Sequence, residues 1–294
     1  MTASTFSDYY ELCKPRVVML IVFTAVIGMF LAVPTPADLP LVETIFGTIG
    51  IGLAAASAAA INQIVEQKLD AKMKRTEDRP LITGGINQKQ ALVFAVIVGL
   101  LAMLMLVILV NPLTAGLTFL SLIGYAFIYT LYLKHATPQN IVIGGAAGAA
   151  PPVLGWAAVE NVVTPDAMIL FLIIFIWTPP HFWALAIAKK DDYAKVGIPM
   201  LPVTHGVKFT RLQVLLYTVL LLIVSVLPFL SGLSGIVYLI AAVILGGIFL
   251  YYAVKMQNPE LKGMPMKTFG YSILYLMLLF SFLLIDHYVK HFFI

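Results

Sequence analysis

The sequence predicts an all-α polytopic membrane protein with nine transmembrane helices. Of its 294 residues, 61% are hydrophobic and only 11% are charged, against about 25% charged in an average soluble domain. The mean hydropathy is +0.98. Apolar runs long enough to cross a bilayer recur along the whole chain, and the basic residues gather in alternate links between them. Together these observations exclude a soluble protein.

Each predicted span is an apolar run close to the roughly 20 residues that a helix needs to cross a bilayer, with 17 to 25 acceptable. No run shows the alternation of about ten residues that marks a membrane β-strand, so helices are the expected spanning element. The nine predicted spans, in chain order, are residues 17–33, 43–64, 91–110, 113–133, 140–158, 167–188, 212–230, 234–254 and 269–289.

The links between these spans alternate in charge, which predicts their sides. The links at 34–42, 111–112, 159–166 and 231–233 contain no Lys or Arg. Of the 18 Lys and Arg residues, all but Lys290 lie in the N-terminal segment or in the other links. The positive-inside rule therefore places the N-terminus in the cytoplasm and the C-terminus outside. The formal charge of +4 reflects topology and attraction to anionic lipid, and it does not indicate nucleic-acid binding.

We expect one transmembrane domain over residues 1–294, with its longest cytoplasmic links at about 65–90 and 189–211. The single cysteine, Cys13, excludes an intrachain disulfide framework and a multi-cysteine metal cluster. The polar N-terminal segment does not resemble a signal peptide or a transit peptide, so a multi-pass protein of the bacterial plasma membrane is expected. Pro151 and Pro152 fall inside the fifth span and are expected to break or bend it.

The first polar cluster follows the second span. Asn62, Glu66 and Asp70 recur every four residues, so on a helix their oxygen atoms form a row about 12 Å long on one face. Arg75 and Arg79 follow closely. Such a set suits a divalent ion that holds a phosphorylated substrate. A helix end among lipid headgroups would explain the basic residues, but it explains the two acids and the deeper asparagine poorly.

The second polar cluster lies in and after the sixth span. Lys189 and Asp192 belong to a charged run that could be an ordinary juxtamembrane cluster. His181 is different, because it lies about two turns inside the membrane edge, and a polar residue at that depth is a functional hypothesis by default. An imidazole there could ligate iron, carry a proton or stabilise developing charge. A histidine satisfied by packing is the alternative.

Three tyrosines share one face of the fourth predicted span: Tyr125, Tyr129 and Tyr132. If they face a cavity, their rings could stabilise a carbocation by cation–π contact. The alternative is a belt of interfacial aromatic residues, which fits Tyr132 better than Tyr125.

The stretch from Asn62 to Leu81 resembles the polyprenyl-diphosphate site of the intramembrane prenyltransferase (UbiA) superfamily. Two further segments, Tyr132 to Trp156 and Pro180 to Val203, follow in the order found in the branch that farnesylates protohaem IX. The opening Lys14-Pro-Arg-Val17 is similar too, so the resemblance runs from about residue 12 to the last helix.

This resemblance implies a nine-helix bundle around a central cavity, with Mg²⁺ as cofactor. The implied reaction transfers the farnesyl group of farnesyl diphosphate to a vinyl group of haem B, with water addition, and gives haem O and diphosphate. A haem A synthase or a terminal oxidase is a possible partner. The implied Mg²⁺–diphosphate ligands are Asn62, Glu66 and Asp70. The implied phosphate contacts are Lys74, Arg75, Arg79 and Lys189. His181 is the implied candidate for haem handling or catalysis, and Lys189 and Asp192 would form the second polar half-site, with Asp192 as a catalytic candidate. Tyr125 and Tyr129 stay candidate cavity residues because of the helix face they share.

The sequence departs from the superfamily pattern at two places. Glu66 stands where Asp is more usual, and the second half-site has Lys189 and Asp192 in place of D-x3-D. A related prenyltransferase acting on a quinone or chlorophyll precursor is the alternative enzyme, which the Pro180-His181-Phe182-Trp183 stretch disfavours. A transporter is the alternative of another class, but it would place charges near the bilayer midplane.

Overall fold

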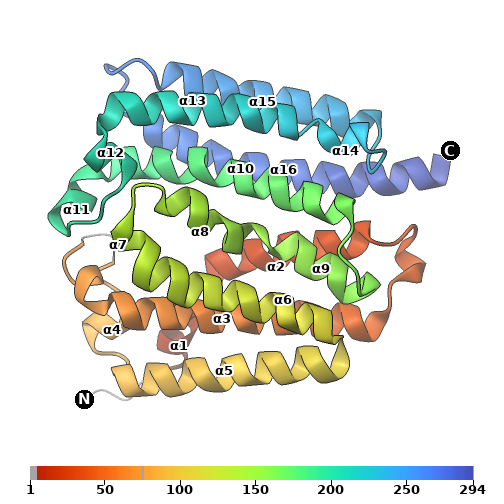
Figure 1. Ribbon diagram of the computed structural model, residues 1–294, viewed down its shortest axis with the longest axis horizontal. Coiled ribbons are helices and arrows are strands. Elements are labelled where there is room, and N and C mark those ends of the chain that lie inside the picture. The colour runs from red at the N-terminus through yellow and green to blue at the C-terminus, as the bar shows by residue number, and fades with distance from the viewer. Residues whose placement is uncertain (1–4, 74–75, 294) are drawn as a thin grey trace.

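The computed structural model describes residues 5–73 and 76–293, and every regular element in that part of the chain is a helix. Figure 1 shows the long helices lying side by side along the longest axis. They are α2 (Pro15–Leu31), α3 (Leu41–Asp70), α5 (Gln88–Leu109), α6 (Pro112–Ile123), α8 (Asn140–Ala149), α9 (Pro151–Glu160), α10 (Pro165–Ala188), α13 (Gly206–Val224), α15 (Ile236–Lys255) and α16 (Met264–Phe293).

Shorter elements connect them, and several gather at one end of the bundle (Figure 1). That end carries α4 (Pro80–Thr83), α7 (Lys134–Ala136), α11 (Lys190–Lys195) and α12 (Leu201–Thr204). The remaining short elements are α1 (Phe6–Leu12), η1 (Pro36–Asp38), η2 (Gly124–Leu133) and α14 (Leu227–Leu230).

The predicted all-helical membrane fold is confirmed. Eight helices in the described ranges are long and apolar enough to cross a membrane, and they correspond in order to the second to ninth predicted spans. The first predicted span corresponds to α2. Helices α1 and α2 are bent by 57° at their joint, and together they give a ninth membrane span only if the pair counts as one span. The count of nine therefore stays a prediction.

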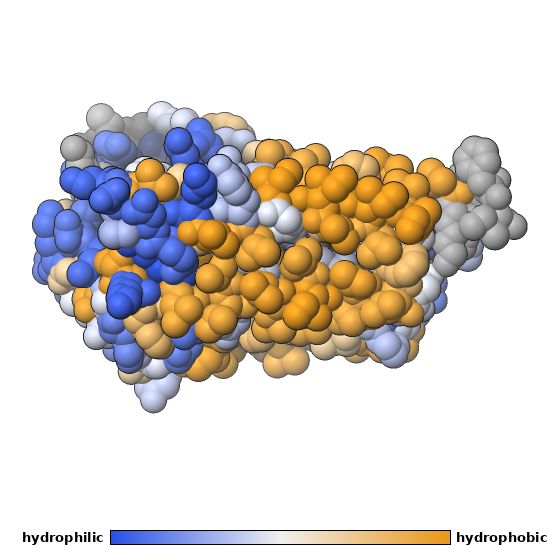
Figure 2. Space-filling model, turned by 90° about the horizontal axis from the view of Figure 1, so that it is seen from above, coloured by the Kyte–Doolittle hydropathy of each residue, from blue (hydrophilic) through white to orange (hydrophobic). Residues whose placement is uncertain are grey.

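The surface divides into a polar end and an apolar band. Figure 2 shows hydrophilic residues gathered at the end that carries α4, α11 and α12, followed by a broad hydrophobic surface. Large side chains of α5 illustrate the band: Leu100, Leu104 and Ile108 are 60%, 56% and 71% exposed. Such a large exposed apolar surface is unfavourable in water and is expected against lipid.

The two prolines of the fifth span interrupt its helix as predicted. Helix α8 ends at Ala149 and α9 begins at Pro151, where the missing N–H groups fall in a first turn and cost no internal hydrogen bond. The two helices together still have the length and composition of one span, residues 140–160. Helix α9 crosses α2 closely, because Gly155 lies against the Ala25 carbonyl and Gly28 against that of Pro152.

Candidate functional site

The C-terminal half of α3 buries a row of three polar side chains. Asn62, Glu66 and Asp70 are 3%, 5% and 1% exposed, whereas Val65 on the same helix is 39% exposed. The four-residue spacing predicts that all three share one face of the helix, and in the structure that face is buried. Helix α3 extends to Asp70, six residues beyond the predicted end of the span, so the whole row lies on one continuous helix.

Each member of this row contacts a cationic side chain from another segment. Lys14 Nζ donates to Asn62 Oδ1 at 2.5 Å, and Lys134 Nζ donates to Glu66 Oε1 at 2.5 Å. The guanidinium of Arg79, at the start of α4, forms an ion pair with Asp70. Ion pairs with so little solvent access need both partners, since removing one leaves an uncompensated buried charge.

Two further contacts hold the side chain of Asn62, the first residue of the row. The amide nitrogen of Asn62 donates to Thr130 Oγ1 at 3.1 Å, which leaves the amide oxygen facing Lys14. The Thr130 hydroxyl in turn donates to the Tyr125 carbonyl at 2.8 Å. Thr130 belongs to η2, a π-helical segment, and such segments often occur at functional sites. The sequence analysis missed Lys14, Thr130 and Lys134 as site residues.

Asp70, the last residue of the row, contacts the loop that follows α3. The Thr76 hydroxyl donates to the Asp70 carbonyl at 2.8 Å, and so covers the C-terminal turn of α3. Arg79, later in the same loop, forms its ion pair with the Asp70 carboxylate, and the Arg79 side chain is 18% exposed. The two predicted phosphate contacts between them, Lys74 and Arg75, lie outside the described residues.

The oxygen donors of the row fit a magnesium ion that shares its coordination with a substrate. Within the ranges that the structure describes, no three His, Cys, Asp or Glu side chains converge as a ready-made metal cage. Mg²⁺ does not require such a cage, because it binds through one or two carboxylates, water and phosphate oxygens. Among the described residues, Asp70 Oδ1 is buried and has no hydrogen-bond partner, so this oxygen is available as a hard donor to such an ion.

The two predicted cavity tyrosines stack on each other. The ring centroids of Tyr125 and Tyr129 are 5.7 Å apart with an interplanar angle of 18°, and both side chains are partly buried. Tyr129 lies directly against α8, where a Cβ added at Gly144 would be 2.2 Å from its ring. Tyr132, the third member of the predicted face, is 68% exposed.

His181 is buried between aromatic rings on another part of the bundle. Its ring stacks on Trp177 at 4.2 Å and on Phe269 of α16 at 4.6 Å. Its Nδ1 lies 2.6 Å from the Ser272 hydroxyl. These contacts join α10 to α16, whereas the α3 row contacts the α1–α2 joint, η2, α7 and α4. The structure therefore places His181 in a separate cluster from the row.

The second predicted polar half-site, Lys189 and Asp192, lies on other helices than the α3 row. Lys189 links the end of α10 to α11, and Asp192 is in the first turn of α11. Both side chains are partly exposed, and α11 packs on α10 and α12. The C-terminal end of α3 and the helix α11 lie at the same end of the bundle (Figure 1).

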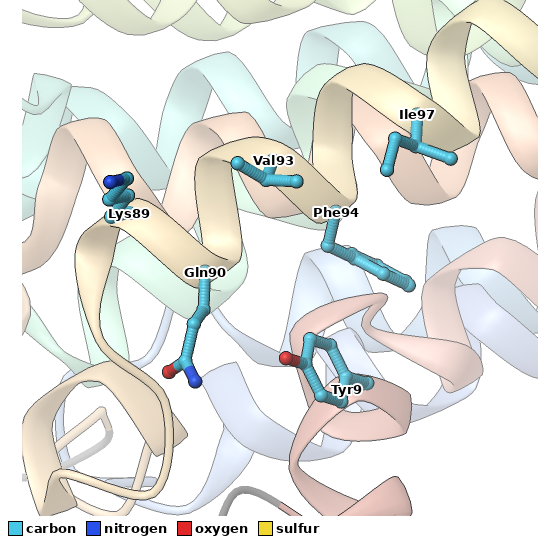
Figure 3. A pocket seen from close by; sticks show the side chains of 6 residues that line it. All are labelled: Tyr9, Lys89, Gln90, Val93, Phe94 and Ile97. Atoms are coloured by element: carbon cyan, nitrogen blue, oxygen red, sulfur yellow. The ribbon is translucent and has the colours of Figure 1, made fainter.

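Two pockets among the described residues lie away from the centre of the bundle, and the predicted central cavity stays a prediction. One, of about 390 Å³, is a groove beside α1 and the start of α5, and Figure 3 shows Tyr9 and Phe94 facing each other there. The other, of about 250 Å³, lies toward the opposite end of the bundle and includes Trp156, Asp166 and His287 in its lining.

The chain matches a known protein family over most of its length. Residues 21–284 match the UbiA prenyltransferase family. A protoheme IX farnesyltransferase of Methylococcus capsulatus is 60% identical over 286 residues, which cover 97% of this chain and 95% of that protein.

Two solved structures show the same fold at low sequence identity. A structure of a digeranylgeranylglyceryl phosphate synthase aligns with a TM-score of 0.80 at 19% identity, covering 96% of this chain and 98% of that one. A UbiA homologue from Archaeoglobus fulgidus bound to GPP and Mg²⁺ aligns with a TM-score of 0.62 at 15% identity, covering 94% and 99%. The buried polar row, the helical bundle and the match over nearly the whole chain lead to one conclusion: this protein belongs to the UbiA prenyltransferase family.

Proposed function

We propose that this protein transfers the farnesyl group of farnesyl diphosphate to a vinyl carbon of haem B, with water addition, and gives haem O and diphosphate. The observation that carries the proposal is the 60% identity, over 97% of the chain, to a protein named protoheme IX farnesyltransferase. The buried row on α3 supports the proposal, because its oxygen donors would hold a metal ion at the leaving group.

The proposed diphosphate site combines the α3 row with nearby cations. Asn62, Glu66 and Asp70 would hold Mg²⁺, whose charge would stabilise the departing diphosphate. Arg79 lies on Asp70, so its guanidinium can also reach a phosphate bound there, a group that arginine binds in a bidentate manner. Lys74, Arg75 and Lys189 are proposed phosphate contacts, and Asp192 is a proposed catalytic residue of the second half-site.

The polar end of the bundle is the proposed entrance, and we place it in the cytoplasm of a bacterial cell with the protein in the plasma membrane. The links rich in Lys and Arg support this orientation. The diphosphate head would then bind at the polar end, and the farnesyl chain would extend into the apolar part of the bundle. Tyr125 and Tyr129 stack on each other close in sequence to Thr130, which contacts the row. Their proposed role is to stabilise an allylic cation through their rings.

The direct test is detection of haem O by mass spectrometry after incubation of the purified protein with haem B, farnesyl diphosphate and Mg²⁺. A parallel incubation with 4-hydroxybenzoate as acceptor tests the quinone-precursor alternative. Haem O formation with release of diphosphate would support the proposal. Prenylation of 4-hydroxybenzoate alone, or uptake of a solute with no turnover, would reject it. A haem A synthase or terminal oxidase is a proposed recipient of the product, and co-purification would test that contact.

We propose that His181 acts on the haem side of the reaction. Replacing it by Ala removes a ring that stacks on Trp177 and Phe269, and we expect haem affinity to fall about tenfold, equivalent to about 1.4 kcal/mol. A haem absorbance titration measures this change. Affinity for farnesyl diphosphate is expected to stay the same, because the contacts of His181 are separate from those of the row.

The matched control for this prediction is Ser272→Ala, which removes the hydroxyl beside His181 Nδ1 and keeps the ring. Unchanged haem affinity and unchanged haem O formation in His181→Ala would show that the residue serves packing alone.

A further inference from the structure

Thr130 is a fully buried threonine whose hydroxyl has an unusual direction. Its Oγ1 donates to the Tyr125 carbonyl at 2.8 Å, five residues earlier in the chain. Buried threonines of two ordinary helices, Thr178 in α10 and Thr218 in α13, donate instead to the carbonyl four residues earlier. A step of five residues is the hydrogen-bond spacing of a π-helix, which is the form that η2 takes. The direction of the Thr130 hydroxyl therefore follows from the π-helical winding of its own segment.

The single proton of this hydroxyl decides the orientation of the Asn62 amide. A backbone carbonyl can only accept a hydrogen bond, so the Thr130 proton is used by the Tyr125 carbonyl. Thr130 Oγ1 can then only accept from its other neighbour, which is the amide nitrogen of Asn62 at 3.1 Å. The reverse orientation of the amide would set two oxygen atoms against each other with no proton between them. Thr130 thus distinguishes the two ends of the amide.

The other end of the Asn62 amide is its oxygen, and a second contact agrees with this orientation. Asn62 Oδ1 accepts from Lys14 Nζ at 2.5 Å, and an ammonium group can only donate. An amide oxygen has two lone pairs, so it has the capacity for a further partner. This oxygen is a hard donor of the kind that Mg²⁺ binds, whereas the amide NH₂ group would present hydrogen atoms to a cation. Turning the amide over would therefore remove one donor oxygen from the row.

We propose that Thr130 is a positioning residue, which orients the Asn62 amide so that its oxygen is available to a metal ion. The inference rests on the function proposed above, in which Asn62 is a metal ligand, and it adds a residue that acts only through Asn62. Removing a group that orients a metal ligand typically weakens metal binding by about 10- to 100-fold. Thr130→Val keeps nearly the same shape and removes the hydroxyl, so it isolates this effect.

The test measures binding of tritium-labelled farnesyl diphosphate to the purified protein at increasing Mg²⁺ concentrations. Haem B is left out, so no turnover takes place. Thr130→Val is compared with wild type and with Thr130→Ser, which keeps a hydroxyl, and Thr130→Ala replaces the valine variant if that one does not fold. Thr218→Val is the matched control, because Thr218 is equally buried and its hydroxyl donates to the Val214 carbonyl of its own helix. That helix, α13, packs on α10 and α15.

Thr130→Val is expected to need about tenfold more Mg²⁺ for half-maximal binding, because the amide of Asn62 is no longer held in one orientation. Saturating Mg²⁺ should restore its binding of farnesyl diphosphate, which a damaged fold would not allow. Thr130→Ser and Thr218→Val should have the Mg²⁺ requirement of wild type. A Thr130→Val protein with the wild-type requirement, or a Thr130→Ser protein as impaired as Thr130→Val, would overturn the inference.

A double variant separates orientation of the amide from packing. The two oxygens of a carboxylate are equivalent, so Asn62→Asp leaves no amide for Thr130 to orient. Adding Thr130→Val to Asn62→Asp should therefore change the Mg²⁺ requirement by less than about twofold. A further increase of about tenfold in that background would assign the effect of Thr130→Val to packing and overturn the inference.

Haem O formation by the wild type is measured in parallel, so that the two proposals can fail separately. The expected shift in Mg²⁺ requirement without haem O formation would reject the proposed function and retain this inference. Haem O formation with an unchanged Mg²⁺ requirement in Thr130→Val would reject this inference and retain the function. A wild-type protein that binds no farnesyl diphosphate at any Mg²⁺ concentration would reject both.

Discussion

Replacing Asp70 by Ala is expected to reduce haem O formation by about 10³-fold or more, the size of loss seen when a group that stabilises transition-state charge is removed. Asp70 is 1% exposed and ends the helix that carries the row. Its removal deletes one of two carboxylates proposed to hold the metal, and it leaves Arg79 without its anionic partner. Mass detection of haem O at saturating farnesyl diphosphate, haem B and Mg²⁺ measures the loss.

The matched control is Asp78→Ala, which removes the same charge from an exposed position in the same loop. This variant is expected to keep near-normal activity. Both proteins must first be shown to insert in the membrane and to purify in equal amounts, since a buried ion pair is disturbed in only one of them. Activity of Asp70→Ala within about tenfold of the control would remove Asp70 from the proposed diphosphate site.

The bundle could be predicted from the sequence because the bilayer fixes the length of each spanning helix. The second to ninth predicted spans correspond to helices in the same order. The buried row was predictable for a similar reason, since a spacing of four residues fixes the relative direction of side chains on any helix. Asn62, Glu66 and Asp70 are buried together as that spacing requires.

The partners of the row were not predictable, because they come from distant parts of the chain. Lys14 and Lys134 lie 48 and 68 residues from the residues that they contact. In the sequence each is simply a basic residue that borders an apolar run, Lys14 before the first and Lys134 after the fourth, which the positive-inside rule already explains. A single sequence also gives no sign that His181 faces Ser272 of α16, 91 residues away.

The contact between α2 and α9 is equally invisible in the sequence, and it gives the second large expected effect. A Cβ at position 155 would lie 1.9 Å from the carbonyl oxygen of Ala25, and one at position 28 would lie 2.2 Å from that of Pro152. Backbone atoms cannot rotate away as a side chain can. Gly155→Ala is therefore expected to lower the free energy of unfolding by more than about 3 kcal/mol, at the upper end of the cost of overpacking.

Gly148→Ala is the matched control for this substitution, because a Cβ at that position of α8 meets no atom within 4 Å. Ala at a helical position with open space is expected to be neutral or slightly stabilising, since it restricts the unfolded chain. Thermal unfolding of both purified variants in detergent measures the difference. Equal stability would contradict the close α2–α9 crossing.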